Sequence, residues 1–185
     1  LGRGLIEKFK KTNKYKNFKI VIASRNFDKN IQSQIKYSCE FSPLDVSNIE
    51  SVRDCLYKFR PEIIIHAAAS KFVQISEEYP FECIDTNING SVNIVRVANE
   101  IKAKIAVFIS TDKSAQPIEN IYGFSKAISE RIFLSQKNKF TKFTCVRFGN
   151  IAWSTGSVFP IWLNMNKNKQ LIESTGYNMR RFFFS

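Results

Sequence analysis

The sequence lacks the features that would place the chain in a membrane, outside the cell or around a metal ion. No stretch approaches the ~20 uninterrupted apolar residues of a membrane-spanning helix. No signal peptide is visible either, because charged residues from Arg3 to Lys11 interrupt the first apolar cluster. The single histidine and four cysteines without a CxxC pair argue against a zinc site or a disulfide framework. We therefore expect a cytoplasmic protein with buried, reduced cysteines and no metal or membrane partner.

Acidic residues are also scarce: 28 Lys and Arg stand against 16 Asp and Glu, and the formal net charge is +12. Basic proteins often bind polyanions, but here the excess is dispersed through surface-like segments. We expect no nucleic-acid partner on this charge alone, and a phosphate-bearing small ligand fits it equally.

No repeat, low-complexity tract or Gly/Ser linker divides the 185 residues, a length that suits one domain with a real core. The chain begins at Leu1 rather than Met and stops at Ser185 within an apparent strand. Both ends indicate a fragment of a longer protein.

Strand and helix signals alternate along the chain. Short apolar runs predict strands over 18–23, 62–67, 104–110 and 143–147. Helical spacing predicts helices over 3–12, 27–35, 80–100 and 120–137. A capping-box pattern from Ser47 to Glu50 opens a further helix that Pro61 ends, and Ser42-Pro43 marks a break. The predicted fold class is α/β, a doubly wound parallel sheet covered on both faces.

Parallel sheets of this kind bind ligands at the carboxyl ends of their strands. The residues that follow the predicted strands are therefore candidates for a site: Ser24-Arg25, His66-Ala67-Ala68-Ala69 and Ser110-Thr111-Asp112-Lys113. His66 itself reads as a packed core residue.

Tyr122 and Lys126 are four residues apart on a predicted helix, so they project from one face. A nearby ammonium favours the phenolate, and we expect it to lower the Tyr122 pKa so that the side chain can take a proton from a sugar hydroxyl. This spacing resembles the short-chain dehydrogenase/reductases, where the lysine also holds the nicotinamide ribose. An exposed amphipathic turn is the alternative.

A hydroxyl, a carboxylate and an amine follow the strand over 104–110, at Thr111, Asp112 and Lys113. Burial that raises a carboxyl pKa makes an acid, and burial that lowers an amine pKa makes a base. A polar loop with a local ion pair is the alternative, but the position at a strand end just before Tyr122 favours an active site.

Further motifs complete a series that covers essentially the whole chain: His66-Ala67-Ala68-Ala69-Ser70-Lys71, Thr86-Asn87-Ile88-Asn89-Gly90, Val146-Arg147-Phe148-Gly149-Asn150 and Gly156-Ser157-Val158-Phe159-Pro160. With the two clusters above, this series resembles the nucleotide-sugar 4,6-dehydratases of polysaccharide biosynthesis, and most closely the inverting UDP-N-acetylglucosamine 4,6-dehydratases. The resemblance implies an NADP-binding Rossmann domain over residues 1–160 and the start of a substrate-binding lobe over 161–185. It also implies a homo-oligomer.

The resemblance implies a redox-neutral dehydration. In this reaction Tyr122 assists oxidation at C4, and Thr111 binds the oxygen on C4. Lys113 removes the C5 proton, Asp112 protonates the departing C6 hydroxyl, and Lys126 serves the catalytic tyrosine and the cofactor. The presence of Tyr122 and of Lys113 favours the inverting, acetamido-sugar branch.

The cofactor implied is NADP, with NAD as the second possibility. Arg25 suits a 2′-phosphate, although an ordinary surface charge is the alternative. Asp45, with Val46 beside it, matches the position that contacts adenine. The three alanines Ala67, Ala68 and Ala69 are small enough for the dinucleotide, with helix–sheet packing as their alternative role. The glycine-rich phosphate loop is absent, and Gly2 is at most its last glycine.

The residues expected to contact substrate are Lys71, Asn150, Ser157, Val158 and Arg181. Trp153 and Thr155 depart from the usual pattern, so either UDP- or GDP-N-acetylglucosamine fits the sequence. Two other functions stay open: a nucleotide-sugar epimerase or reductase, which needs no acid–base pair at 112–113, and a non-catalytic nucleotide- or polyanion-binding domain.

Overall fold

The computed structural model describes residues 2–12, 15, 17–137, 139–154, 157–172, 180 and 182–184. Its helices are α1 (Gly2–Lys11), α2 (Phe27–Tyr37), α3 (Ile49–Phe59), α4 (Val73–Glu78), α5 (Pro80–Ile84), α6 (Gly90–Glu100), α7 (Ile121–Leu134) and α8 (Val158–Lys167). A π-helical segment, Asp85–Asn89, joins α5 to α6, and a 3₁₀ turn, Asp112–Ser114, follows β4. The strands are β1 (Val21–Ser24), β2 (Glu40–Pro43), β3 (Ile63–His66), β4 (Ile105–Thr111), β5 (Lys142–Phe148), β6 (Asn150–Ile151) and β7 (Phe183–Phe184).

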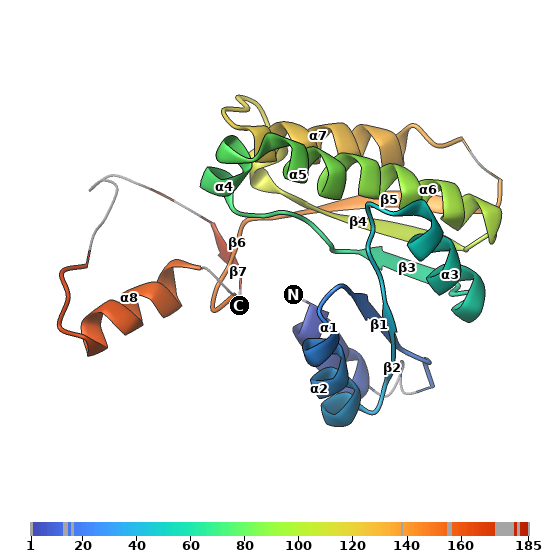
Figure 1. Ribbon diagram of the computed structural model, residues 1–185, viewed down its shortest axis with the longest axis horizontal. Coiled ribbons are helices and arrows are strands. Elements are labelled where there is room, and N and C mark those ends of the chain that lie inside the picture. Colours follow the sequence, from blue (N-terminus) through green and yellow to red (C-terminus); the bar gives the residue numbers. More distant parts are fainter. Residues whose placement is uncertain are drawn as a thin grey trace.

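Every strand pair in the described residues is parallel, which confirms the predicted α/β fold class. The ladders are β1–β2, β3–β4–β5 and β6–β7, and no described residue pairs β1 with β3. Helices α5 to α7 lie along one face of β3–β4–β5, while α1 and α2 lie beside β1–β2 (Figure 1). On the other face of β3–β4–β5, Ile63, Ile65 and Val146 are about 40% exposed (43%, 39% and 40%), so the expected cover on both faces is incomplete among the described residues.

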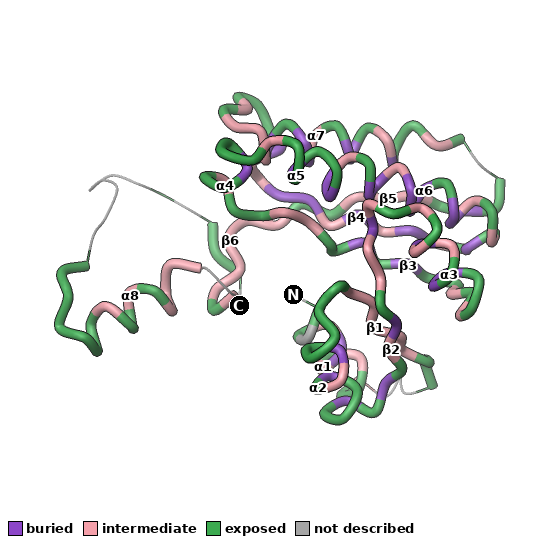
Figure 2. The backbone as a smooth tube through the Cα atoms, viewed as in Figure 1, coloured by how far each residue is buried: buried purple, intermediate pink, exposed green. Residues whose placement is uncertain are grey.

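The main core lies between that sheet and its helices. Val52, Val97, Ala106, Phe108 and Phe133 are fully buried there. Figure 2 shows the buried positions concentrated in β4, α6 and α7. A smaller core in the first part of the chain contains Ile6 of α1 with Tyr37 and Cys39.

Asparagine side chains begin three of the helices because a short amide oxygen can accept the unpaired N–H groups of the first turn. The oxygen of Asn26 accepts from Lys29 N, that of Asn48 from Glu50 N and Ser51 N, and that of Asn120 from Gly123 N. The capping box expected from Ser47 is therefore wrong by one residue.

Ser47 does not cap the helix, because its side chain bonds to Asp45 instead. Its backbone N–H and its hydroxyl both donate to the same carboxylate oxygen of Asp45, at 3.0 and 2.7 Å. The predicted helix to Pro61 ends at Phe59, where Arg60 takes the left-handed conformation.

Other predicted elements differ in detail. Ser42 and Pro43 do not break the chain but form the end of β2, where the missing N–H of proline removes no needed hydrogen bond. The predicted helix over 80–100 exists, but its middle widens into the π-helical Asp85–Asn89. The helix predicted to 137 ends at Leu134.

No helix among the described residues is long and apolar enough to cross a membrane. The described His, Cys, Asp and Glu residues form no cluster of three or more that could hold a metal ion. All four cysteines are free thiols, and burial is confirmed for Cys39, Cys55 and Cys83, whereas Cys145 is partly exposed.

The core arrangement predicts a large difference between two phenylalanine substitutions. Phe133 is fully buried and its ring lies 5.1 Å from that of Phe108, so Phe133→Ala should lower the free energy of unfolding by about 3–5 kcal/mol. Phe81→Ala removes a ring that is 80% exposed and should change it by no more than about 0.5 kcal/mol. Urea titration of both variants checks this, and equal losses would contradict the placement of the core.

Candidate active site at the end of β4

The carboxyl end of β4 holds three polar side chains in direct contact. The Thr111 hydroxyl donates to a carboxylate oxygen of Asp112 at 3.0 Å, and Thr111 Oγ1 accepts from the backbone N–H of Lys113 at 3.3 Å. The Lys113 ammonium lies 3.4 Å from the same Asp112 oxygen, and both side chains are about one-third exposed (34% and 36%). The carboxylate and the ammonium are therefore partly open to solvent at this strand end, whereas Thr111 beside them is buried.

Helix α7 brings Tyr122 to this cluster. A Cβ placed on Gly123 would lie only 2.5 Å from the carbonyl oxygen of Lys113, so only glycine lets the first turn of α7 approach so closely. At this approach the Tyr122 phenol comes close enough to the Thr111 hydroxyl for Thr111 to affect the Tyr122 pKa.

The expected lowering of the Tyr122 pKa is wrong. Burial disfavours the phenolate and raises the pKa above its ordinary value. The Thr111 side chain lowers the Tyr122 pKa and so opposes the effect of burial, whereas the negative charge of Asp112 raises this pKa further. Tyr122 is therefore a protonated phenol at neutral pH in this structure.

Lys126 lies one turn further along α7 and is only 3% exposed. Its ammonium lies 4.0 Å from the centre of the Phe108 ring. Burial lowers the Lys126 pKa to about 8, although the charge of Glu130 opposes the shift. The alternative explanation of Tyr122 and Lys126, an exposed amphipathic turn, is wrong for Lys126 because its side chain is buried.

His66, at the end of β3, is structural as predicted. Its ring is buried, stacks on Phe133 with 6.0 Å between ring centres, and lies 3.3 Å from the Ser91 hydroxyl. Burial first, and then the charge of Lys126, lowers the His66 pKa to about 3, so the imidazole is neutral.

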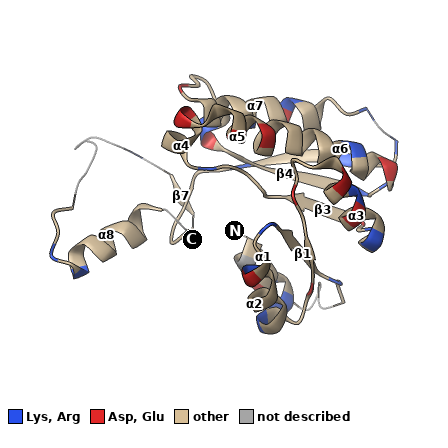
Figure 3. Ribbon diagram, viewed as in Figure 1, with Lys and Arg blue, Asp and Glu red and all other residues tan. Residues whose placement is uncertain are grey.

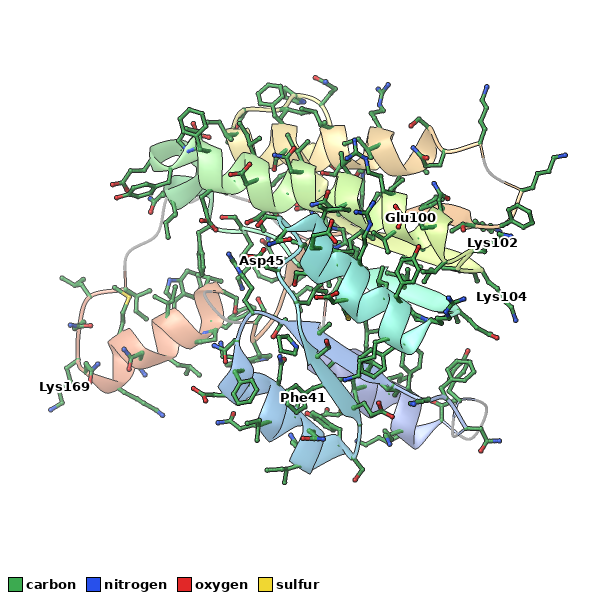
Figure 4. The ribbon with its side chains drawn as sticks, turned by 45° about the vertical axis from the view of Figure 1, so that its right-hand side comes forward. Phe41, Asp45, Glu100, Lys102, Lys104 and Lys169 are labelled. Carbon is green, nitrogen blue, oxygen red and sulfur yellow. The ribbon has the colours of Figure 1, made fainter. Side chains whose placement is uncertain are left out.

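Two charged residues predicted to contact a cofactor lie near the end of β1. Arg25 is half-exposed and lies 3.6 Å from a carboxylate oxygen of Glu82 in α5. Asp45 lies where the chain runs from β2 to α3 (Figure 4). The hydrogen bond from the Ser47 hydroxyl, with a smaller contribution from the Arg25 charge, lowers the Asp45 pKa.

The remaining predicted cofactor residues differ in environment. Ala67 and Ala68 are exposed, so helix–sheet packing is wrong as their role, whereas Ala69 is partly buried. Val46 is 5% exposed and packs on Gly90 within the core. Gly2 is the first residue of α1, and a Cβ there would meet nothing within 4 Å.

The predicted substrate residues fall into two groups. Lys71 follows β3 in the exposed segment before α4, and burial and the charge of Lys29 lower its pKa. Asn150, Ser157 and Val158 lie in β6 and at the start of α8, which stand beyond the carboxyl end of β5 (Figure 1). The Ser157 hydroxyl is buried without a partner among the described residues. Thr155 and Arg181 lie outside the described residues.

Asn87 is the residue that the sequence reasoning missed. In the π-helical segment it is 1% exposed, and its amide group bonds Ser70 N at 2.8 Å, Ser70 O at 3.0 Å and Ser125 Oγ at 2.8 Å. The backbone carbonyl oxygen of Asn87 accepts from the hydroxyls of Ser91 and Ser129. Asn87 thus ties the loop after β3 to α7. The sequence offers one signal for this role, which is an amide side chain within the helix predicted over 80–100.

A family model matches almost the whole chain. The sequence profile of the family described as polysaccharide biosynthesis protein matches residues 6–185. The fold is that of a Rossmann-type α/β protein. The chain belongs to the polysaccharide biosynthesis protein family.

Curated relatives carry several names. The chain is 37% identical over 150 residues to the capsular polysaccharide biosynthesis protein CapD of Staphylococcus aureus, covering 79% of this chain and 25% of that protein. It is 32% identical over 177 residues to an inverting UDP-N-acetylglucosamine 4,6-dehydratase of Campylobacter jejuni, covering 92% of this chain and 53% of that protein. It is 34% identical over 193 residues to a UDP-glucose 4-epimerase of Rickettsia bellii, covering 100% of this chain and 55% of that protein. The chain thus spans a quarter to about half of these relatives' length.

Solved structures confirm the fold. Pen from Bacillus thuringiensis aligns with a TM-score of 0.80 and 31% identity, over 89% of this chain and 54% of that one. A UDP-glucose 4-epimerase from Thermotoga maritima, solved with UDP-glucose, aligns with a TM-score of 0.82 and 17% identity, over 98% of this chain and 65% of that one.

The hydrogen bonds of Asn87 predict a specific stability loss. Asn87→Ala removes the side-chain amide that bonds the partly buried N–H and carbonyl groups of Ser70. Because these groups lose their partner, the free energy of unfolding should fall by about 1–3 kcal/mol. Asn89→Ala is the matched control from the same π-helical segment, because the Asn89 amide donates only to Asp85 in an exposed position. Urea titration measures both, and a loss in the control as large as in Asn87→Ala would contradict the proposed linking role.

Proposed function

We propose that this chain is part of a nucleotide-sugar 4,6-dehydratase acting on UDP-N-acetylglucosamine, with GDP-N-acetylglucosamine as the second candidate substrate. The observation that carries the proposal is the Asp112–Lys113 pair, whose charged groups lie 3.4 Å apart beside Thr111 and Tyr122. Reversible oxidation needs only the tyrosine and lysine of α7. An additional acid and base at one strand end suit an elimination, in which a C–H bond and a C–O bond both break.

A nicotinamide cofactor fits the residues present. Proteins of the same fold were solved with NAD, from Thermus thermophilus and Brucella ovis, and with NADP, from Bacillus anthracis. The Lys126 side chain, 3% exposed on α7, would bind the ribose hydroxyls of the cofactor. When bound, the cofactor would take up hydrogen from C4 of the sugar and return it to C6.

Other residues proposed for the cofactor line the strand ends. Arg25 would bind a 2′-phosphate after leaving Glu82, which favours NADP. Asp45 would face the adenine end, and the exposed alanines would let the dinucleotide approach. We assign Gly2 and Val46 to the same site on sequence position alone. Residues 1–160 are the proposed cofactor domain, and 161–185 the start of the substrate lobe.

The chain's own groups would perform the proton transfers. Thr111 would bind the oxygen on C4 while Tyr122 exchanges the proton of that hydroxyl. Oxidation at C4 acidifies the C5 hydrogen, which Lys113 would remove as a proton. The electron pair would form the C5–C6 double bond as the C6–O bond breaks, and Asp112 would protonate the departing hydroxyl to water.

The proposed substrate contacts lie at the sheet edge and beyond it. Lys71 would reach the sugar nucleotide from the loop after β3. Asn150, Ser157 and Val158 would contact it from β6 and α8, together with Arg181. We further propose that the protein is a cytoplasmic homo-oligomer serving surface polysaccharide synthesis.

A 4-epimerase is the second candidate, because the Rickettsia bellii relative with that name matches along the whole chain. It would use Tyr122 and Lys126 and would need neither Asp112 nor Lys113. The two reactions differ in mass balance: dehydration removes one water, whereas epimerisation leaves the mass unchanged.

Mass spectrometry of the product separates these candidates. The complete reading frame, incubated with UDP-N-acetylglucosamine and NADP, should yield a sugar nucleotide lighter by one water. Lys113→Met should slow its formation by at least about 10²-fold because the proposed C5 base is lost.

Lys104→Met is the matched control. Lys104 is 69% exposed and pairs only with Glu62, so this variant should keep the wild-type rate. A product of unchanged mass would favour the epimerase, and full activity of Lys113→Met would exclude Lys113 as the base.

A further inference from the structure

A buried carboxylate lies directly beneath the site. Glu130 of α7 is 6% exposed and accepts two hydrogen bonds from the guanidinium of Arg147 in β5, at 2.8 Å from Nε and 2.6 Å from Nη2. Burial disfavours the charged carboxylate, but the hydrogen bonds from Arg147, Ser110 and Ser114 outweigh this and lower the Glu130 pKa. Glu130 is therefore a fixed negative charge at neutral pH.

The same carboxylate joins α7 to the 3₁₀ turn that carries the proposed acid and base. The Ser114 hydroxyl lies 2.8 Å from Glu130 Oε1 and 2.6 Å from the carbonyl oxygen of Thr111. Asp112 and Lys113 lie between these two anchors in sequence. Glu130 thus connects the turn bearing them to the helix bearing Tyr122.

The Glu130 charge also acts on Lys126, which is four residues earlier on the same face of α7, and it opposes the effect of burial on the Lys126 pKa. The other ionisable groups around Lys126 come from three further elements: Cys83 of α5, Cys145 of β5 and His66 of β3. His66 is neutral, and burial, with the Glu130 charge, raises the Cys145 pKa to about 11, so neither is charged at neutral pH. Cys83 is a fully buried thiol that lies 3.5 Å from the Ser125 hydroxyl.

We propose that Glu130, held by Arg147, is a positioning residue of this site: its carboxylate fixes the turn of Asp112 and Lys113 against α7 and keeps the buried Lys126 ammonium charged. The consequence of this role for catalysis rests on the proposed function. The electrostatic coupling between Glu130 and Lys126 does not depend on it. Arg147 weakens the effect of Glu130 on Lys126, because its positive charge partly neutralises the carboxylate.

A purely structural salt bridge is the competing explanation. Isolated buried ion pairs contribute little to stability compared with apolar side chains of the same size. Here Arg147 remains about half-exposed while Glu130 is buried among serine hydroxyls, an arrangement that orders polar groups more than it fills a core. The two explanations differ in what they predict for Lys126.

The titration of Lys126 provides the test. In the complete reading frame with isotope-labelled lysine, NMR should show Lys126 titrating near pH 8, with the signal assigned by its loss in Lys126→Arg. Glu130→Gln keeps the size and hydrogen-bonding capacity of the side chain but removes its charge. The buried ammonium then loses its counter-charge, so the Lys126 pKa should fall by on the order of one unit.

A second variant moves the same pKa in the opposite direction. Arg147→Gln removes the cation that neutralises Glu130, so the Lys126 pKa should rise. This variant keeps the proposal testable if Glu130→Gln does not fold. Glu50→Gln is the matched control: Glu50 pairs with Arg53 at 2.8 Å on the exposed surface of α3, and Lys126 should titrate there as in the wild type.

The outcomes separate this proposal from the proposed function. Opposite shifts in the two variants would support the positioning role, whichever reaction the protein catalyses. A lower melting temperature with an unmoved Lys126 pKa would reduce Glu130 to a structural residue and overturn it. If the protein forms product, the alkaline limit of its rate should move to lower pH in Glu130→Gln, because the ammonium is charged only below its pKa. Absence of product in the wild type would count against the dehydratase alone.

Discussion

The close approach of α7 to the end of β4 is the constraint on which the rest of the site depends. Gly123 allows it, since any side chain there would collide with the carbonyl oxygen of Lys113. The Asn120 cap directs the first turn of α7, and Glu130 fastens the helix to Ser114 from below. Only with this contact do the groups proposed for oxidation and those proposed for elimination share one strand end.

Burial gives the site its electrostatic character. The same desolvation raises the Tyr122 pKa and lowers that of Lys126, so these two groups are pushed towards their neutral forms. Neighbouring carboxylates then act on each group: Asp112 raises the Tyr122 pKa further, whereas Glu130 opposes the fall in the Lys126 pKa. Elsewhere the described Lys and Arg residues lie on several separate elements, among them α2, α3 and α8 (Figure 3).

Much of the architecture could be predicted because apolar runs and helical spacing are local signals. The strand before Thr111 and the helix carrying Tyr122 follow from them, and so does the position of Asp112 and Lys113 at a strand end. The role of Asn87 could not be predicted, because its partners Ser70 and Ser125 are 17 and 38 residues away in sequence. The direction of the Tyr122 pKa also depends on burial, which spacing alone does not reveal. The sequence pattern predicts Ser47 as a helix cap, because it does not reveal that the Ser47 hydroxyl bonds to the Asp45 carboxylate in the folded chain.

The most direct test of a dehydratase is the fate of the sugar's C5 hydrogen. The complete reading frame would be incubated with UDP-N-acetylglucosamine and NADP in D₂O and followed by proton NMR. Removal of the C5 proton by Lys113 and reprotonation from solvent predicts a 4-keto-6-deoxy product with deuterium at C5, and the C5 configuration shows whether it is inverted. A product that keeps its original C5 hydrogen would contradict elimination at this site.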